Sequence, residues 1–268
     1  MDESESKPRF AWQPLTPHGV GAFAEAPFGR VLLVQFIVAL LASATVVWFV
    51  RFSWFPVVRT AIGRLPVQGQ IVNGRLDWHA ESPITLAEGK YLAFTVDLKH
   101  KADLRSPADV QVEFGEKNFR VISLFGFLQR SYSPAWRLGF NRDELGPWWG
   151  AWSPAILAIV AVSVGFGLLL TWAALGSLYS VAVWLIAFFA DRKLSFWGSW
   201  RVAAAALMPG ALLLTTGILL YGLGTLDLVG LLAAVAIHWV LGWFYGVGGA
   251  LCAPRHPVDQ GLKQNPFI

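Results

Sequence analysis

His238 is the residue of this sequence whose position most suggests chemistry. It is the only ionisable side chain deep within a long apolar stretch. Such a residue can carry protons or hold a ligand, and imidazole titrates near neutral pH. A proton pathway usually needs a second titratable group, however, and no Asp, Glu, Lys or Arg accompanies His238. We therefore expect a neutral imidazole that hydrogen-bonds either a backbone carbonyl or a Ser or Thr on a neighbouring helix, with candidates that include Ser163, Thr171, Thr215 and Thr216.

His238 belongs to a regular row of small residues. Its members recur every four positions, which places them along one face of a helix: Gly230, Ala234, His238, Gly242, Gly246 and Ala250. Small side chains let another helix approach closely. The row is predicted to be a helix-packing face, and the alternative is a groove that lines a substrate path. Pro209 lies in the preceding apolar stretch, where its missing N–H predicts a kink that could serve as a hinge.

Outside the apolar stretches, four residues have the side-chain types that bind zinc: His79, Glu81, Asp97 and His100. Their spacing matches no known ligand pattern, so we expect solvated strand and loop residues instead. The sequence contains no Ser-centred nucleophile elbow, HExxH motif or carboxylate pair. Its one cysteine, Cys252, excludes an internal disulfide. These observations predict a protein that is not an enzyme and has no catalytic, metal or cofactor site.

The elements that must position these residues are long stretches without charge. The chain has 268 residues, of which 55% are hydrophobic and only 14% charged. Residues 31–50 and 153–190 carry no charge, and residues 202–251 carry only Asp227. A membrane-spanning helix needs roughly 20 apolar residues. The sequence therefore predicts a multi-span α-helical membrane protein with a small β-rich external domain between spans one and two.

The number of spans depends on residues 153–190. One helix of this length would measure about 57 Å. A hairpin broken near Gly176-Ser177 would instead add a fifth span. We favour a single long helix, and hence four spans.

The positive-inside rule orients the chain. Arg192, Lys193 and Arg201 predict that residues 191–201 form a cytoplasmic loop, although Arg51 and Arg59 after the first span argue for the opposite orientation. The predicted parts are a cytoplasmic tail (1–30), the first transmembrane helix (31–50), the external β-rich domain (51–152), a C-terminal transmembrane block (153–251) and a second cytoplasmic tail (252–268).

Alternating side chains in the external domain predict β-structure. Apolar residues occupy every second position in residues 92–98 and 110–114. Asn73-Gly74 between apolar flanks is typical of a two-residue hairpin turn. We expect a sheet of four or five strands. Trp148, Trp149 and Trp152 are amphipathic, so they predict the headgroup level where the chain re-enters the membrane.

Residues 187–210 resemble a segment of the YIP (Ypt-interacting) membrane proteins. The matching features are the basic Arg192 and Lys193, the pair Ser195-Phe196, and Pro209. The layout also resembles a related bacterial family of unknown function, known as maltodextrin-utilisation membrane proteins, through residues 65–66, 71–76 and 94–97. The resemblance implies a helical membrane bundle with partner proteins, and it implies no catalytic residues.

Together these features predict a non-enzymatic protein of a bacterial inner (plasma) membrane. We expect an accessory or scaffold protein that lies in the lipid bilayer and whose external domain binds a partner or envelope ligand. Homo-oligomers are compatible with this expectation. The alternative is a small-solute transporter, or a transporter subunit, that uses the small-residue groove around His238. No cluster of Lys and Arg with interleaved aromatic residues indicates nucleic-acid binding.

Overall fold

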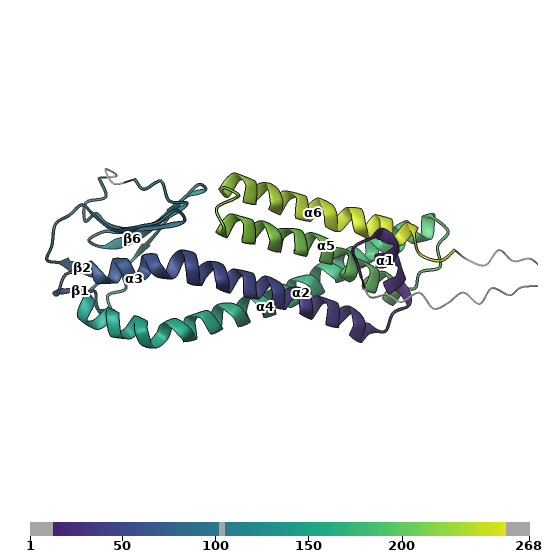
Figure 1. Cartoon of the computed structure of the whole chain (residues 1–268), viewed down its shortest axis with the longest axis horizontal. Helices are drawn as coiled ribbons and strands as arrows, with labels where there is room; N and C mark the ends of the chain where they lie inside the picture. The colour runs from purple at the N-terminus through teal and green to yellow at the C-terminus, as the bar shows by residue number, and fades with distance from the viewer. Residues whose placement is uncertain (1–12, 102–104, 256–268) are drawn as a thin grey trace, which may run out of the picture. The chain divides into compact units, whose positions relative to one another are not determined.

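The computed structural model describes residues 13–101 and 105–255. The chain divides into two compact units, drawn in Figure 1. One comprises Met1–Ser43 and Ser163–Ile268, and the other comprises Ala44–Val162. We refer to them as the helical unit and the β unit.

Four helical runs of the described chain are long and apolar enough to cross a membrane: Phe28–Gly63, Arg142–Phe189, Phe196–Gly222 and Leu228–Leu251. The first run consists of α2 (Phe28–Phe49), the π-helical segment η2 (Val50–Trp54) and α3 (Phe55–Gly63). The other three are α4 (Arg142–Phe189), α5 (Phe196–Gly222) and α6 (Leu228–Leu251). A short α1 (Pro17–Ala22) and the 3-10 turn η1 (Phe23–Glu25) precede them.

The first helical run does not end near Arg51, where the uncharged stretch ends and where we predicted the end of the first transmembrane helix. Phe55 donates its backbone N–H to the Val50 carbonyl, five residues back. Pro56 follows in the first turn of α3, where its missing N–H does not interrupt a ladder. The wider π-turn therefore lets the chain remain helical for three more turns.

The prediction of one continuous helix over residues 153–190 is confirmed, and α4 already begins at Arg142. The alternative break at Gly176-Ser177 is wrong. Ser177 donates its hydroxyl to the Ala173 carbonyl within the helix. Gly176 serves packing instead, since a Cβ there would lie only 3.4 Å from the Cβ of Ala204 on α5.

The core of the helical unit is built around α5. Small residues from Ala203 to Ala206 are almost fully buried, as is Met208. They let the neighbouring helices approach, and Figure 1 shows α5 and α6 side by side with α1 near the end of α6. At that end a Cβ on Gly249 would lie 2.6 Å from a methyl group of Val20. Close backbone approach thus holds the N-terminal helix against α6.

The β unit contains eight strands in its described residues: the expected sheet of four or five strands is present with five, and a second sheet of three strands was not expected. They are β1 (Gly69–Val72), β2 (Arg75–Trp78), β3 (Ile84–Glu88), β4 (Leu92–Val96), β5 (Val110–Phe114), β6 (Asn118–Ser123), β7 (Gly126–Ser131) and β8 (Arg137–Gly139). They form a five-stranded sheet in the order β3-β4-β5-β6-β7 and a three-stranded sheet in the order β2-β1-β8. Only β4 and β5 pair in parallel. The second sheet escaped prediction because its strands are short and β8 lies far along the chain from β1.

The predicted hairpin at Asn73-Gly74 is confirmed as the connection between β1 and β2. Asn73 has φ of 52° and Gly74 has φ of 74°. Two successive positive φ angles define a type I′ turn, whose twist matches that of the flanking strands. Ala61 on α3 and Leu65, just after the end of α3, form a core with Leu86 and Val96 of the five-stranded sheet.

Candidate functional site

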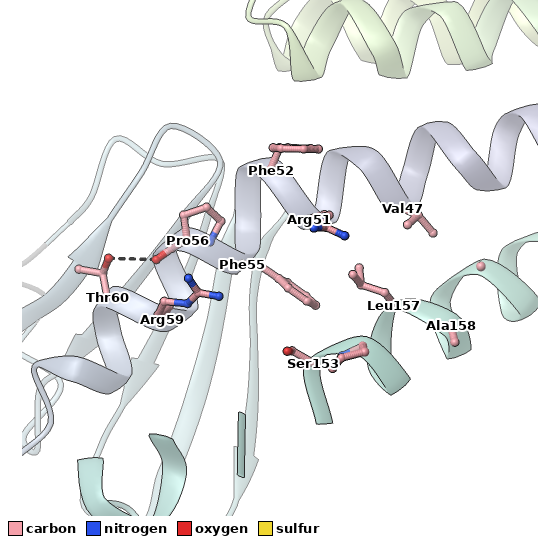
Figure 2. A pocket seen from close by; sticks show the side chains of 12 residues that line it. Val47, Arg51, Phe52, Phe55, Pro56, Arg59, Thr60, Ser153, Leu157 and Ala158 are labelled. Atoms are coloured by element: carbon pink, nitrogen blue, oxygen red, sulfur yellow. Dashed lines mark hydrogen bonds between the residues drawn. The ribbon is translucent and has the colours of Figure 1, made fainter. Parts of the chain in front are cut away.

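The β unit contains an open groove between the first helical run and α4. Its volume is about 850 Å³. Figure 2 shows its two walls: side chains of residues 47–60 on one side and of residues 153–161 on the other. The lining residues are Val47, Arg51, Phe52, Phe55, Pro56, Arg59, Thr60, Ser153, Pro154, Leu157, Ala158 and Ala161.

Two guanidinium groups give the groove a positive charge. Arg51 and Arg59 both line it, and no acidic residue does. Within the described chain, neither arginine has a carboxylate at salt-bridge distance. The Arg51 guanidinium lies 5.9 Å from the ring centroid of Phe52, which offers only a weak cation–π contact at an exposed site. The groove thus has cationic groups available for an anion.

The groove is also polarised along its length. Figure 2 places Val47 and Ala158 at one end, and Arg59 and Thr60 at the other. Thr60 donates its hydroxyl to the Pro56 carbonyl at 2.9 Å, so its oxygen can accept but its proton is engaged. Ser153 adds a hydroxyl from α4. A ligand that fits this gradient has an anionic end and an apolar end.

Aromatic rings brace the two helices beside the groove. Phe55 contacts Trp149 edge-on at 4.7 Å between ring centroids. Trp148 and Trp152 stack at 6.4 Å one turn apart on α4. The indole nitrogen of Trp149 is buried without a hydrogen-bond partner in the described chain. The position of these tryptophans at the headgroup level stays a prediction. The contact between Phe55 and Trp149 holds the arginine-bearing segment against α4.

A second polar constellation lies inside the five-stranded sheet. On β5, Gln111 and Glu113 are each only 3% exposed, whereas Val110 and Val112 are half-buried. Gln111 donates to the Thr95 hydroxyl at 3.0 Å and accepts from the Ser106 N–H at 2.9 Å. These bonds satisfy the amide group, which makes its burial tolerable.

His100 anchors the other end of this constellation. Its Nδ1 lies 2.5 Å from a carboxylate oxygen of Glu113, and its Nε2 lies 2.6 Å from the amide oxygen of Asn118. Arg120 lies 3.8 Å from the same carboxylate. A Cβ at Gly115 would collide with the imidazole. Both ring nitrogens are therefore engaged, and the geometry is that of a brace between β5 and β6.

The four residues considered for a metal do not converge. His79 pairs with Asp77 at 3.2 Å, while His100 pairs with Glu113. The expectation that all four are solvated is wrong for Asp97, which is 2% exposed and accepts from the Lys99 N–H at 3.1 Å. Among residues 13–101 and 105–255, no group of three or more His, Cys, Asp or Glu could hold a metal ion.

The edge strand β7 is exposed along its whole length. Within the described strands it pairs only with β6, so its outer backbone edge is open. The hairpin that carries it also bears large exposed apolar side chains: Leu124, Phe125, Phe127 and Leu128, of which Phe125 is 80% exposed. An open edge with apolar side chains is a docking or aggregation surface in most proteins.

In the helical unit, most of the small-residue row faces α5. A Cβ on Gly242 would lie 3.5 Å from Leu207, and one on Gly246 would lie 3.7 Å from Val183 of α4. Ala250 is fully buried, and Ala234 lies against Gly217 of α5. Gly230 differs, because it sits in the first turn of α6 and donates its N–H to the Asp227 carboxylate at 2.7 Å. The cavity beside Gly242 and Gly246 has a volume of about 10 Å³, hardly room for one water.

His238 lies where α6 comes closest to α5. A Cβ on Gly210 would be 2.7 Å from the His238 carbonyl oxygen. Its Nδ1 is buried with no hydrogen-bond partner in the described chain. Three of the four hydroxyl partners expected for it bond elsewhere: Thr171, Thr215 and Thr216 each donate to a carbonyl four residues back in their own helix. No described residue supplies the predicted interhelical hydrogen bond.

The remaining candidates lie at the ends and in the middle of α5. Pro209 is buried within α5, which continues through it as one helix. Ser195 is the N-cap of α5 and accepts from the Gly198 N–H at 3.0 Å, and the neighbouring Phe196 is exposed. Arg192 donates to the Ala253 carbonyl at 3.1 Å, and the N–H of Lys193 donates to the Pro254 carbonyl. The basic loop is therefore tied to the segment that follows α6.

Comparison with protein families, with curated proteins and with solved structures finds no match for this chain. The resemblance to YIP proteins stays a prediction. The groove escaped prediction because Arg51 and Arg59 lie about a hundred residues from Ser153 in the sequence. The sequence feature that could have indicated the groove is the presence of Arg51 and Arg59 after the first apolar run. These arginines entered the sequence analysis only as evidence on the orientation of the chain in the membrane.

Proposed function

We propose that this chain is a multi-pass integral membrane protein of a bacterial inner (plasma) membrane, with four spans. The observation that carries the proposal is the set of four long apolar helical runs. Their outward faces bear large exposed side chains such as Leu40, Phe166 and Val240. In water this surface would be costly, whereas in a bilayer it contacts acyl chains.

Within that membrane, we assign the protein an accessory or scaffold role without catalysis. The β unit is the part that binds a partner, and the docking surface is the β6–β7 hairpin. An extended apolar segment of a second envelope protein could add a strand to β7, where main-chain bonds give affinity and contacts with exposed side chains such as Phe127 give selectivity. A role in a membrane assembly would also agree with the resemblance to YIP proteins.

Transport of a small solute is less well supported. The small-residue face lies against α5 and leaves almost no free volume. His238 has no second ionisable residue beside it in the apolar run. These observations favour packing as the role of that face.

Photocrosslinking tests the partner assignment. A photoreactive amino acid would be placed at Phe125 or Leu128 of the full chain in cells, with Leu138 on β8 as an exposed apolar control. We expect a protein adduct of one defined mass at the two hairpin positions and none at the control. Adducts with lipid alone, or the same adducts at all three positions, would refute docking by β7. Release of the protein from membranes by alkaline carbonate would refute the membrane assignment.

A further inference from the structure

We infer that the groove between residues 47–60 and α4 binds an anionic phospholipid, with the phosphate at Arg51 and Arg59. The inference rests on the proposed membrane location but on no part of the docking surface at β7. Its occupant is one lipid molecule whose acyl chain lies along Val47 and Ala158.

The first argument is charge. Two arginines that line one groove without an acidic partner repel each other and attract an anion. Arg51 directly follows an uncharged run of twenty residues, so it lies at the edge of the apolar zone. At that depth the anion of highest local concentration is the lipid phosphate. Basic pockets between membrane helices bind phospholipid head groups by this chemistry.

The second argument is the apolar wall. A free phosphate would need only the two guanidinium groups, yet the groove continues past them. Val47, Leu157 and Ala161 extend it into the apolar parts of both helices. A volume of about 850 Å³ exceeds what a small anion fills, and it suits a head group with the first part of its chains. The shape therefore favours an amphiphile over a soluble anion.

The third argument is how the backbone places the arginines. The π-turn at Val50–Trp54 contains Arg51, and it shifts the helical phase by one residue before the chain reaches Arg59. π-turns inside helices occur frequently at functional sites. Despite a separation of eight residues, Arg51 and Arg59 both line the same groove. Phe55, midway between them in the sequence, also lines the groove and points toward Leu157 (Figure 2).

Native mass spectrometry of the full chain tests the inference. The protein would be reconstituted in vesicles of phosphatidylcholine and phosphatidylglycerol, washed with alkaline carbonate and extracted into mild detergent. The measured quantity is the retained phosphatidylglycerol per protein. We expect the double variant Arg51→Gln/Arg59→Gln to lose retention about 30-fold, which is about 1 kcal/mol for each cation. Arg64→Gln/Arg75→Gln changes net charge equally, lies outside the groove and should change retention less than about threefold.

Further measurements distinguish a bound phospholipid from a free phosphate anion. Ala158→Trp keeps every charge but fills the groove, so it should also lower retention. An excess of inorganic phosphate or glycerol phosphate, at constant ionic strength, should not displace the lipid. Circular dichroism and thermal melting would establish that each variant is folded. The inference would be overturned if folded Arg51→Gln/Arg59→Gln or folded Ala158→Trp retained as much lipid as the unchanged protein. It would also be overturned if the control pair lost as much lipid, or if free phosphate displaced the lipid. Loss of the protein in the carbonate wash would overturn the membrane assignment and the lipid site with it.

Discussion

Replacement of Gly210 by alanine tests how closely α5 and α6 pack. A Cβ at this position would lie 2.7 Å from the backbone carbonyl oxygen of His238 and 3.1 Å from its Cδ2. The nearer atom belongs to the backbone, so no rotamer change relieves the contact. A carbon–oxygen contact needs roughly 3.4 Å, so α6 would have to withdraw by about 0.7 Å along this line.

The expected cost follows from this displacement. Overpacking of a well-packed interior costs about 1–3 kcal/mol. Gly246→Ala is the matched variant, since its Cβ would make ordinary contacts at 3.7 Å and 4.0 Å. That change should be neutral or gain up to about 1 kcal/mol from helix propensity. The two variants should therefore differ by about 1–4 kcal/mol in the free energy of unfolding.

Thermal unfolding in mild detergent measures the difference. At about 2–4 °C per kcal/mol, Gly210→Ala should melt at least roughly 2 °C below Gly246→Ala. Gly167→Ala on α4 is a propensity control, because no heavy atom lies within 4 Å of its Cβ position. If Gly210→Ala melts with or above the other two variants, the close approach of α5 to His238 is not present in the protein.

Three further predictions concern other parts of the chain. A topology reporter fused after Ala190 should give a cytoplasmic signal and one near Ser106 an external signal, and reversed signals at both sites would contradict the orientation. Burial raises the pKa of Tyr132, whose hydroxyl donates to the Gly115 carbonyl at 3.1 Å. The folded state therefore keeps that proton at a pH where the unfolded chain loses it. The contribution of Tyr132 to the free energy of unfolding should be constant below about pH 10 and should fall above it by up to about 1.4 kcal/mol per pH unit. Tyr132→Phe should remove this dependence in pH-dependent melts, and a persisting slope would assign it to another group. His100→Ala should destabilise the β unit by about 2 kcal/mol, because it removes a hydrogen bond to the buried Glu113 carboxylate. Hydrogen exchange of the β5 and β6 amides measures this loss of stability. Unchanged protection of these amides would show that the imidazole does not stabilise the pairing of β5 and β6.

The sequence by itself determined the features that depend on local composition. Long runs without charge predict long apolar helices, because the apolar character of such a run depends on its own residues and not on which other segment it contacts. The Asn73-Gly74 turn belongs to the same class, since its two positive φ angles follow from the two residue types. The absence of charge from residues 153–190 predicted an apolar helical run, but it did not distinguish one long helix from a hairpin broken near Gly176-Ser177.

Only the tertiary structure decided which distant residues meet. The alternation in β5 predicts a strand, but the burial of Glu113 depends on His100 and Arg120, which other segments supply. The second sheet needs β8 to pair with β1 across some seventy residues, and the groove needs α4 beside Arg51 and Arg59. Charge and hydrophobicity are properties of single residues, whereas a binding site is a property of their arrangement. For this reason the helices could be predicted from the sequence, and the cationic groove could not.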